Sequence, residues 1–109
     1  MVKDQTINSV KIVIPTYLTL WDLEKELNKA MRQIVEYGNI CIINMEKVRN
    51  VYSATIQLLQ RIIDRATRFA CSVYIVNASE IVCNALKSAG IDEKVPVFSK
   101  EPLPELIDY

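Results

Sequence analysis

The sequence predicts an α/β fold in which a mostly parallel or mixed sheet of about four to five strands packs with about four helices. Two observations carry this prediction. Residues 40–43 read Ile-Cys-Ile-Ile and are apolar throughout, which is typical of a strand covered on both faces in the middle of a parallel sheet. After a short polar turn, residues 53–69 place apolar side chains at helical spacing. Strands that alternate with helices favour right-handed crossovers and therefore a mostly parallel sheet.

The first segment, residues 6–14, is predicted to form one or two strands near a sheet edge. Pro15 is expected to end it, because proline fits poorly inside a sheet. A helix is expected next, with Thr19 as its N-cap, Asp22 placed to accept from the free amides, and Gly38 as its left-handed cap. The apolar stripe of this helix is expected to comprise Leu20, Leu23, Leu27, Ala30, Met31 and Ile34.

The central predicted helix follows the polar turn at residues 50–53. Ser53 stands where a hydroxyl can accept hydrogen bonds from the first-turn amides of this helix. The inward stripe is expected to comprise Ile56, Leu59, Ile62, Ile63, Ala66 and Phe69. The other face is expected to carry Gln57, Gln60, Arg61, Asp64, Arg65 and Arg68. A working surface is expected at this junction, because open α/β sheets present function where strands end and helices begin.

A further apolar strand is predicted at residues 72–76, followed by a turn in which Ser79 is the expected cap of another helix. The stripe of that helix is expected to comprise Ile81, Val82, Ala85, Leu86 and Ala89, and Gly90 is expected to close it.

A short last strand is expected at residues 95–98, and Pro104 is expected to begin a terminal helical turn that carries Leu106 and Ile107. The two glycines of the chain both follow predicted helices. Neither is placed to cradle a phosphate, so the sequence lacks the fingerprints of P-loop and dinucleotide-binding proteins.

Composition narrows the class of protein. The chain has 109 residues, half of them hydrophobic, which suits a single globular domain over residues 1–109. Basic and acidic residues balance at 13 each, so neither nucleic-acid binding nor anchoring to an anionic membrane has an electrostatic driving force. The start of the chain lacks the apolar core of a signal peptide, and no apolar run approaches the roughly 18 residues of a membrane span. We therefore expect a cytoplasmic protein without membrane insertion.

Residues that carry enzyme chemistry are scarce. The chain has three cysteines without a C-x-x-C pair and no histidine, so neither a disulfide framework nor a zinc site is expected. The absence of histidine also removes the commonest general base. The central strand ends Asn44-Met45-Glu46, without the aspartate of a phospho-acceptor receiver domain. We expect a non-enzymatic protein with no catalytic residues, no metal and no cofactor.

The junction resembles the signature of STAS domains, the family of anti-sigma-factor antagonists. In that signature a hydrophobic strand ending near Asp or Asn leads to Asp-Ser-(Ser/Thr/Ala)-Gly-Leu at the start of a helix. The matching run here is ICIINMEKVRNVYSATI over residues 40–56. VYIVNAS over 73–79 and LKSAGI over 86–91 resemble the next strand of the family and the helix that ends in a Ser-Gly-Leu-like turn. The order and spacing agree over residues 10–106.

The resemblance implies a switch. In the family, the serine after the aspartate is phosphorylated by a partner kinase that is also an anti-sigma factor, and the unmodified form binds that partner. Ser53 matches this serine, and Ala54 is an allowed neighbour. Tyr52 replaces the aspartate and Thr55 replaces the glycine. A carboxylate is therefore missing, and bulk is added where glycine would let another backbone approach closely.

The expected partner-binding surface comprises Asn50, Tyr52, Ser53, Ala54, Thr55, Arg61 and Arg65. Within it, Ser53 is either a phosphorylation site or only a helix cap. Tyr52 is either an interfacial anchor or a residue that packs locally. The line formed by Arg61, Arg65 and Arg68 is either a docking surface or a solvated helix face.

Two function classes follow from the resemblance. The first is a regulatory antagonist, a monomer when free, in which Ser53 controls binding to a serine kinase or anti-sigma factor. The second is a constitutive interaction module, such as a scaffold subunit or an accessory to a transporter ATPase, that has lost the switch. Tyr52 and Thr55 favour the second class, whereas the retained Ser53 favours the first.

Overall fold

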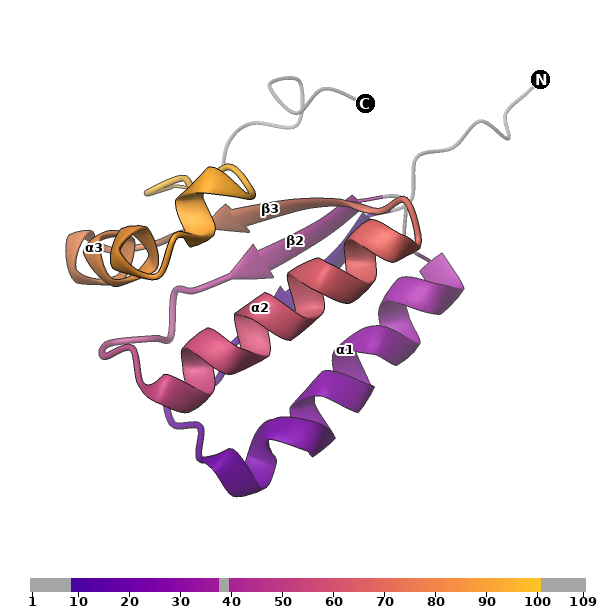
Figure 1. Cartoon of the computed structure of the whole chain (residues 1–109), viewed down its shortest axis with the longest axis horizontal. Helices are drawn as coiled ribbons and strands as arrows, with labels where there is room; N and C mark the ends of the chain where they lie inside the picture. The colour runs from indigo at the N-terminus through magenta and orange to yellow at the C-terminus, as the bar shows by residue number, and fades with distance from the viewer. Residues whose placement is uncertain (1–8, 38–39, 101–109) are drawn as a thin grey trace.

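A computed structural model describes residues 9–37 and 40–100 (Figure 1). The expected strand residues before position 9, the cap at Gly38 and the terminal turn at Pro104, Leu106 and Ile107 lie outside the described residues.

The sheet of the described chain has three strands: β1 (Ser9–Val13), β2 (Ile40–Asn44) and β3 (Ser72–Val76). They lie in the order β1-β2-β3 and all pair in parallel, so that Cys41 of β2 lies between Val10 and Val73. All five residues of β2 are buried. The prediction of a central parallel strand, drawn from an unbroken apolar run, is confirmed.

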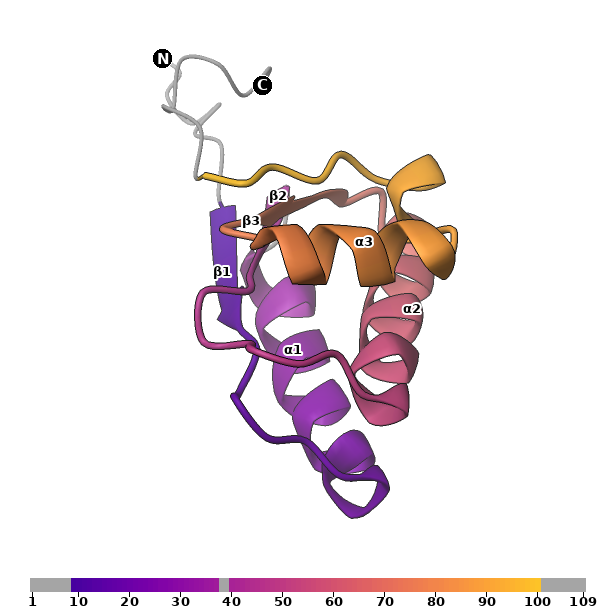
Figure 2. The ribbon, with the colours of Figure 1, turned by 90° about the vertical axis from the view of Figure 1, so that its left-hand side faces the viewer.

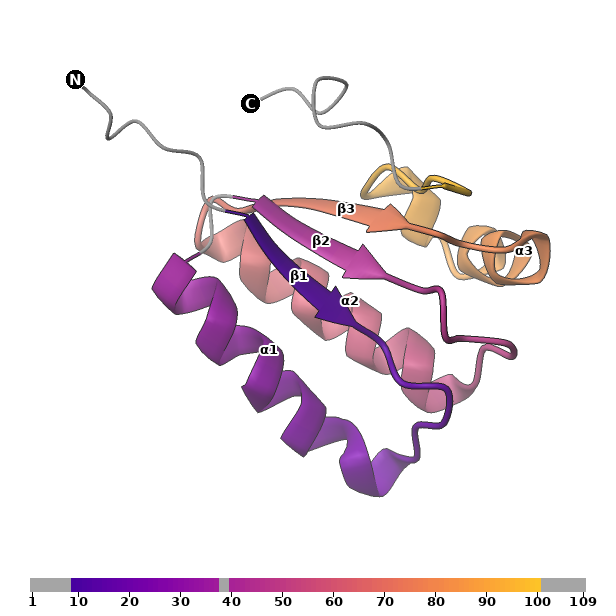
Figure 3. The same ribbon diagram turned by 180° about the vertical axis from the view of Figure 1, so that it is seen from behind.

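The two long helices, α1 (Leu23–Tyr37) and α2 (Ser53–Arg68), cover the same face of the sheet (Figures 1 and 3). This follows from the strand order: two successive right-handed crossovers that step in the same direction place both helices on one side. The third helix, α3 (Glu80–Ser88), lies beyond the carboxyl end of β3 and runs crosswise to the other two (Figure 2). Because the strand order of the described sheet never reverses, residues 9–37 and 40–100 form no crevice at a topological switch point.

The count of four to five strands is too high for the described residues. The expected strand at Val95–Phe98 is a single parallel bridge between Ile75 and Val97. The Ile75 amide donates to the Pro96 carbonyl at 3.0 Å, and the Phe98 amide donates to the Ile75 carbonyl at 2.8 Å. Pro96 has no amide hydrogen with which to extend a ladder, which accounts for the short pairing. Besides the three α-helices, the described chain has 3-10 turns η2 (Leu20–Asp22) and η3 (Ile91–Glu93).

The phase of the long helices is largely as predicted, with corrections at the ends. The middle of each stripe is buried, including Leu27 of α1 and Leu59 of α2. Leu20 is largely exposed, because it lies in η2, where a 3-10 turn has three residues per turn and breaks the 3.6-residue phase. Phe69 is also exposed, since the chain leaves the helix there and Ala70 adopts a φ of 58°.

Smaller corrections concern the flanks of the predicted stripes. Ile56 is only half-buried, whereas Leu58, which the pattern had not placed inside, is buried. Ile81 is exposed at the first turn of α3, while Val82 and Leu86 are buried as expected.

The predicted signals at the helix ends are confirmed at three positions. The Asp22 carboxylate accepts from the Thr19 amide at 3.2 Å and from its hydroxyl at 2.8 Å, and these bonds lower the pKa of Asp22. The Ser79 hydroxyl accepts from the Val82 amide at 3.3 Å and caps α3. Gly90 follows α3 with a φ of 77°, a left-handed conformation that glycine adopts without strain.

The core has two parts. The larger cluster fills the space between the sheet and the helices. On the opposite face, Ile40, Ile42 and Val76 form a smaller cluster against the half-buried Tyr74 and Phe98, whose ring centroids lie 6.4 Å apart. The strand β2 is thus buried on both faces, although the helices of the described residues cover only one of them.

Burial also governs the pKa of the cysteine thiols. All three cysteines are free thiols and form no disulfide. Burial raises the pKa of Cys41 to about 12, and nearby Cys71 adds to the effect. Burial raises the pKa of Cys71 as well. Because the thiolate is the reactive form, these raised pKa values lower the nucleophilicity of both thiols near neutral pH.

Alkylation should therefore modify the three cysteines unequally. In folded protein at about pH 8, below the folded-state pKa of Cys41, iodoacetamide is expected to label the half-buried Cys83 first. Cys41 and Cys71 are expected to react only after denaturant is added. Mass spectrometry of the digested protein checks this, and rapid labelling of Cys41 in the folded state would contradict it.

Within residues 9–37 and 40–100, no helix combines the length and the apolar character that crossing a membrane requires. The same residues hold no group of three or more side chains suited to binding a metal ion.

Candidate functional site

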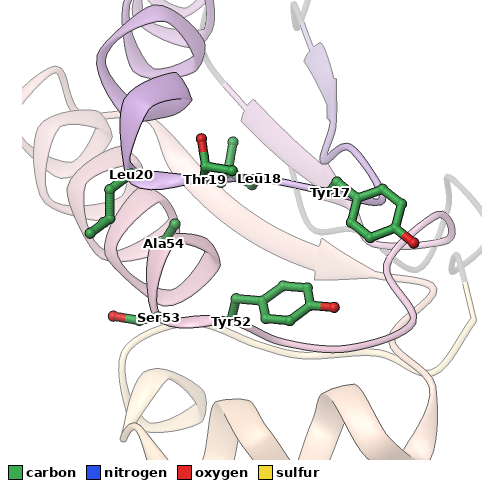
Figure 4. A pocket seen from close by; sticks show the side chains of 7 residues that line it. All are labelled: Tyr17, Leu18, Thr19, Leu20, Tyr52, Ser53 and Ala54. Atoms are coloured by element: carbon green, nitrogen blue, oxygen red, sulfur yellow. The ribbon is translucent and has the colours of Figure 1, made fainter.

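The candidate site lies at the carboxyl ends of β1 and β2. Each strand leads into a loop, residues 14–19 after β1 and residues 45–52 after β2, and the ends of these loops border one groove of about 470 Å³ (Figure 4). Its lining comprises Tyr17, Leu18, Thr19, Leu20, Tyr52, Ser53 and Ala54. The first four come from the approach to α1 and the last three from the start of α2. The expected location, where β2 gives way to α2, is therefore one wall of the groove.

The groove is mostly apolar and exposed. The rings of Tyr17 and Tyr52 lie on the same side of it, while Leu20 and Ser53 lie on the other (Figure 4). Trp21 follows Leu20 in the chain and is 94% exposed. Contiguous patches of exposed apolar side chains mark interaction surfaces, whereas single exposed apolar residues scattered over a surface are ordinary. Tyr17, Leu20 and Tyr52 form such a patch, because all three are exposed and line the same groove.

Ser53 is the first residue of α2, so the helix begins where the helical spacing of residues 53–69 predicts, but Ser53 is not the helix cap. The N-cap is Tyr52, whose carbonyl accepts from the Ile56 amide at 3.1 Å and whose side chain makes no capping bond. The Ser53 hydroxyl instead accepts from the side-chain amide of Gln57 at 3.3 Å. The side chain of Ser53 is exposed, so its hydroxyl is accessible and is not committed to capping the helix.

Thr55 has a structural role. Its side chain is buried, and its hydroxyl accepts from the Tyr52 amide at 3.4 Å. This bond joins the third residue of the helix to its N-cap, as the acidic residue of a capping box does. Ala54 is also buried, although it contributes to the groove. Of the expected partner-binding residues at the turn, Asn50, Tyr52 and Ser53 are exposed.

The three arginines that were predicted to form a line on α2 differ in their ion pairs. Arg61 forms a 3.0 Å ion pair with Glu24 of α1, and Arg68 forms a 3.1 Å pair with Asp64 one turn earlier. Arg65 is exposed and has no ion pair within the described part of the chain. Arg61 therefore links the two helices, and exposed pairs of this kind contribute little to stability.

A buried polar network holds the start of the second loop. Asn44 ends β2 and is buried; its side-chain carbonyl accepts from the Glu46 amide and from the Asn77 side chain, both at 3.0 Å. Its side-chain amide donates to the Glu46 carboxylate at 2.9 Å. Asn77 directly follows β3 and has a φ of 58°, a conformation that asparagine tolerates. Asn44 and Thr55, the two buried polar residues of the described chain, thus fix the two ends of the loop before Ser53.

Sequence reasoning missed the contribution of the first loop to the site. Tyr17, Leu20 and Trp21 lie within a short apolar run, Tyr-Leu-Thr-Leu-Trp, over residues 17–21. One buried helix stripe cannot accept so many large side chains in succession, and that excess is the signal that could have revealed the surface.

Comparisons with known proteins agree with this architecture. The STAS domain family model matches residues 23–102. Among solved structures, a sulfate transporter family protein from Wolinella succinogenes is similar, with a TM-score of 0.68 and 16% sequence identity over 86% of this chain and 77% of that chain. At this identity the likeness concerns the fold alone. A search of curated proteins finds no match.

Proposed function

This chain belongs to the STAS domain family, and we propose that it is a non-enzymatic regulatory protein resembling an anti-sigma-factor antagonist. It binds a partner switch kinase or anti-sigma factor through the groove and the Ser53 turn, and phosphorylation of Ser53 controls that binding. In this proposal the free protein is a cytoplasmic monomer without a cofactor. Analytical ultracentrifugation of the chain should therefore give a molecular mass of 12.5 kDa.

The observation that carries the proposal is the position of the Ser53 hydroxyl. It is exposed at the first turn of α2 and borders an apolar groove formed by Tyr17, Leu20 and Tyr52. A kinase can reach it without unfolding the helix, since capping depends on the Tyr52 backbone and on Thr55. A group added to this oxygen would stand at the rim of the surface that a partner covers.

The energetics of such a switch are modest. A phosphate adds about −1.5 to −2 charge, which the amino end of a helix tolerates in the free protein. A partner that closes over the groove would strip water from the phosphate without supplying cations matched to it. A hundredfold loss of affinity requires only about 2.7 kcal/mol.

Ser53→Asp is therefore expected to leave the melting temperature nearly unchanged while weakening partner binding about a hundredfold. Ser53→Ala should keep the affinity of the parent. Affinity capture identifies the partner, titration calorimetry compares the forms, and mass spectrometry of protein from cells tests for phosphate on Ser53. Ser72→Asp is the matched control, because Ser72 is exposed at the opposite end of the sheet, at the start of β3.

The alternative is a constitutive STAS module, such as a scaffold subunit or an accessory to a transporter ATPase. Tyr52 and Thr55 favour it because they replace the aspartate and glycine of the family signature, and the similar solved structure is a sulfate transporter family protein. Equal affinities for the parent, Ser53→Asp and Ser53→Ala, with no phosphate on Ser53, would select this alternative. Neighbouring genes give a cheaper discriminator: a serine-kinase or sigma-factor gene supports the switch, and transporter genes support the module.

A further inference from the structure

We infer that Tyr52 determines which partner this site accepts, because its ring selects an uncharged, apolar anchor side chain over a charged one. The inference rests on the proposed function, since it concerns the partner that covers the same groove. Three observations support it: the place of Tyr52 at the start of α2, the hydrogen bonds that hold that helix start, and the lining of the groove.

Tyr52 occupies a position at which its side chain contributes nothing to helix capping. It is the N-cap of α2, with a φ of −96° and a ψ of 168°, the extended conformation that is usual there. Serine, threonine, aspartate and asparagine are favoured at an N-cap, because their short side chains accept from an amide of the first turn. The Tyr52 side chain makes no such bond. A departure from a local rule of this kind is expected where a residue serves recognition rather than folding.

The start of α2 is held through the backbone of Tyr52 alone. Its amide donates to the buried Thr55 hydroxyl at 3.4 Å, and its carbonyl accepts from the Ile56 amide at 3.1 Å. Neither bond uses the side chain, which can therefore change without loss of either. The ring is 42% exposed and lies on the same side of the groove as the ring of Tyr17 (Figure 4).

The lining of the groove offers no countercharge, because all of its residues are uncharged. The Thr19 hydroxyl donates to Asp22, and the Ser53 hydroxyl accepts from Gln57. A charged side chain that entered the groove would lose water without meeting an opposite charge in the lining, which costs free energy. An aliphatic or aromatic side chain is stabilised by the same burial. The lining thus sets the character of the anchor, whatever charges the partner carries elsewhere.

One substitution should change this selectivity without loosening the helix. Tyr52→Asp suits the extended backbone of the N-cap and supplies an acceptor for the first-turn amides. It also replaces the ring by a carboxylate on the wall of the groove. A lysine or arginine anchor would then find the countercharge that the parent lacks.

The test is selection from a display library of random peptides of about 12 residues, or about three helical turns, with the intact chain as bait. Parent and Tyr52→Phe should enrich the same peptides, which share an aliphatic or aromatic anchor. Tyr52→Ala and Tyr52→Asn should bind these peptides about tenfold or more weakly. Tyr52→Asp should lose them as well and enrich peptides with lysine or arginine instead. The matched control is Phe69→Ala, which removes an exposed ring at the opposite end of α2 and should leave binding unchanged.

Stability separates recognition from a merely structural role of the ring. Tyr52→Asn and Tyr52→Asp should unfold at a higher urea concentration than Tyr52→Ala, because both restore a side-chain cap. All three should nevertheless have lost the peptides of the parent. An affinity that follows stability across the variants would overturn the inference, since the ring would then act through packing.

The remaining outcomes are equally decisive. Peptides that bind the parent through a charged anchor, or that bind Tyr52→Ala as tightly as the parent, would overturn the inference. A parent that enriches no peptide would also overturn it, whether or not the chain binds a second copy of itself or vesicles of a zwitterionic phospholipid. If the captured partner responds to Ser53→Asp but not to Tyr52→Ala, the switch stands and the inference fails. If it responds to Tyr52→Ala but not to Ser53→Asp, the inference stands and the switch fails.

Discussion

Replacing Leu59 by alanine is expected to lower the free energy of unfolding by about 2–5 kcal/mol. Leu59 lies in the middle of α2, has no exposed surface and belongs to the main core cluster between sheet and helices. Truncation removes buried methyl groups and leaves a cavity that neighbours such as Leu58 and Ile62 fill only in part.

Gln60→Ala provides the matched control, one position further along the same helix. Gln60 is only partly buried and no hydrogen bond of its side chain is found with the described residues, so its loss should change stability by about 0.5 kcal/mol or less. Urea denaturation followed by circular dichroism measures both variants. Equal small losses would show that the inward face of α2 has been assigned to the wrong residues.

Asn44→Asp is expected to destabilise the fold by about 3 kcal/mol near neutral pH, because it places a buried carboxylate against another acceptor. The side-chain amide of Asn44 donates to Glu46 at 2.9 Å, and an ionised aspartate cannot donate. The substitution also brings two negative charges together at this contact.

The loss should depend on pH in a defined direction. Burial and the Glu46 carboxylate would raise the folded-state pKa of Asp at position 44 above its usual value of about 3.9. A protonated carboxyl can donate to Glu46 as the amide does, so the variant should be closest to the parent below about pH 4. Its stability should fall relative to the parent as pH rises from there through the raised pKa.

The matched control for this substitution is Asn84→Asp, at an exposed position of α3. It adds the same charge without a buried partner and should change stability by about 0.5 kcal/mol or less. Denaturation curves for both variants across the acidic and neutral range measure the difference. If the free energies of unfolding of Asn44→Asp and of the parent differ by the same amount at every pH, the proposed role of this network is refuted. The loop that the network anchors leads to Tyr52 and Ser53, so the substitution should also weaken partner binding.

The spacing of apolar residues along the sequence was enough to predict the fold class and most of the strands and helices. The apolar run of β2 and the helical spacing of α2 identified a parallel α/β fold, because burial imposes one period on strands and another on helices. Thr19 with Asp22, and Ser79, marked two helix starts through hydrogen bonds that span only three residues. The run around Ser53 indicated the family that the comparison with family models then showed.

The groove and its surroundings were decided by the tertiary structure. Leu20 was expected in a buried stripe, but η2 changes its direction and makes it part of the same groove as Tyr52, which lies far along the chain. Arg61 meets Glu24, and Asn44 meets Asn77, across separations of 37 and 33 residues. A periodic pattern records which side of its own element a residue faces. It holds no information on which distant loop lies opposite, because that depends on the crossovers and packing of the whole chain.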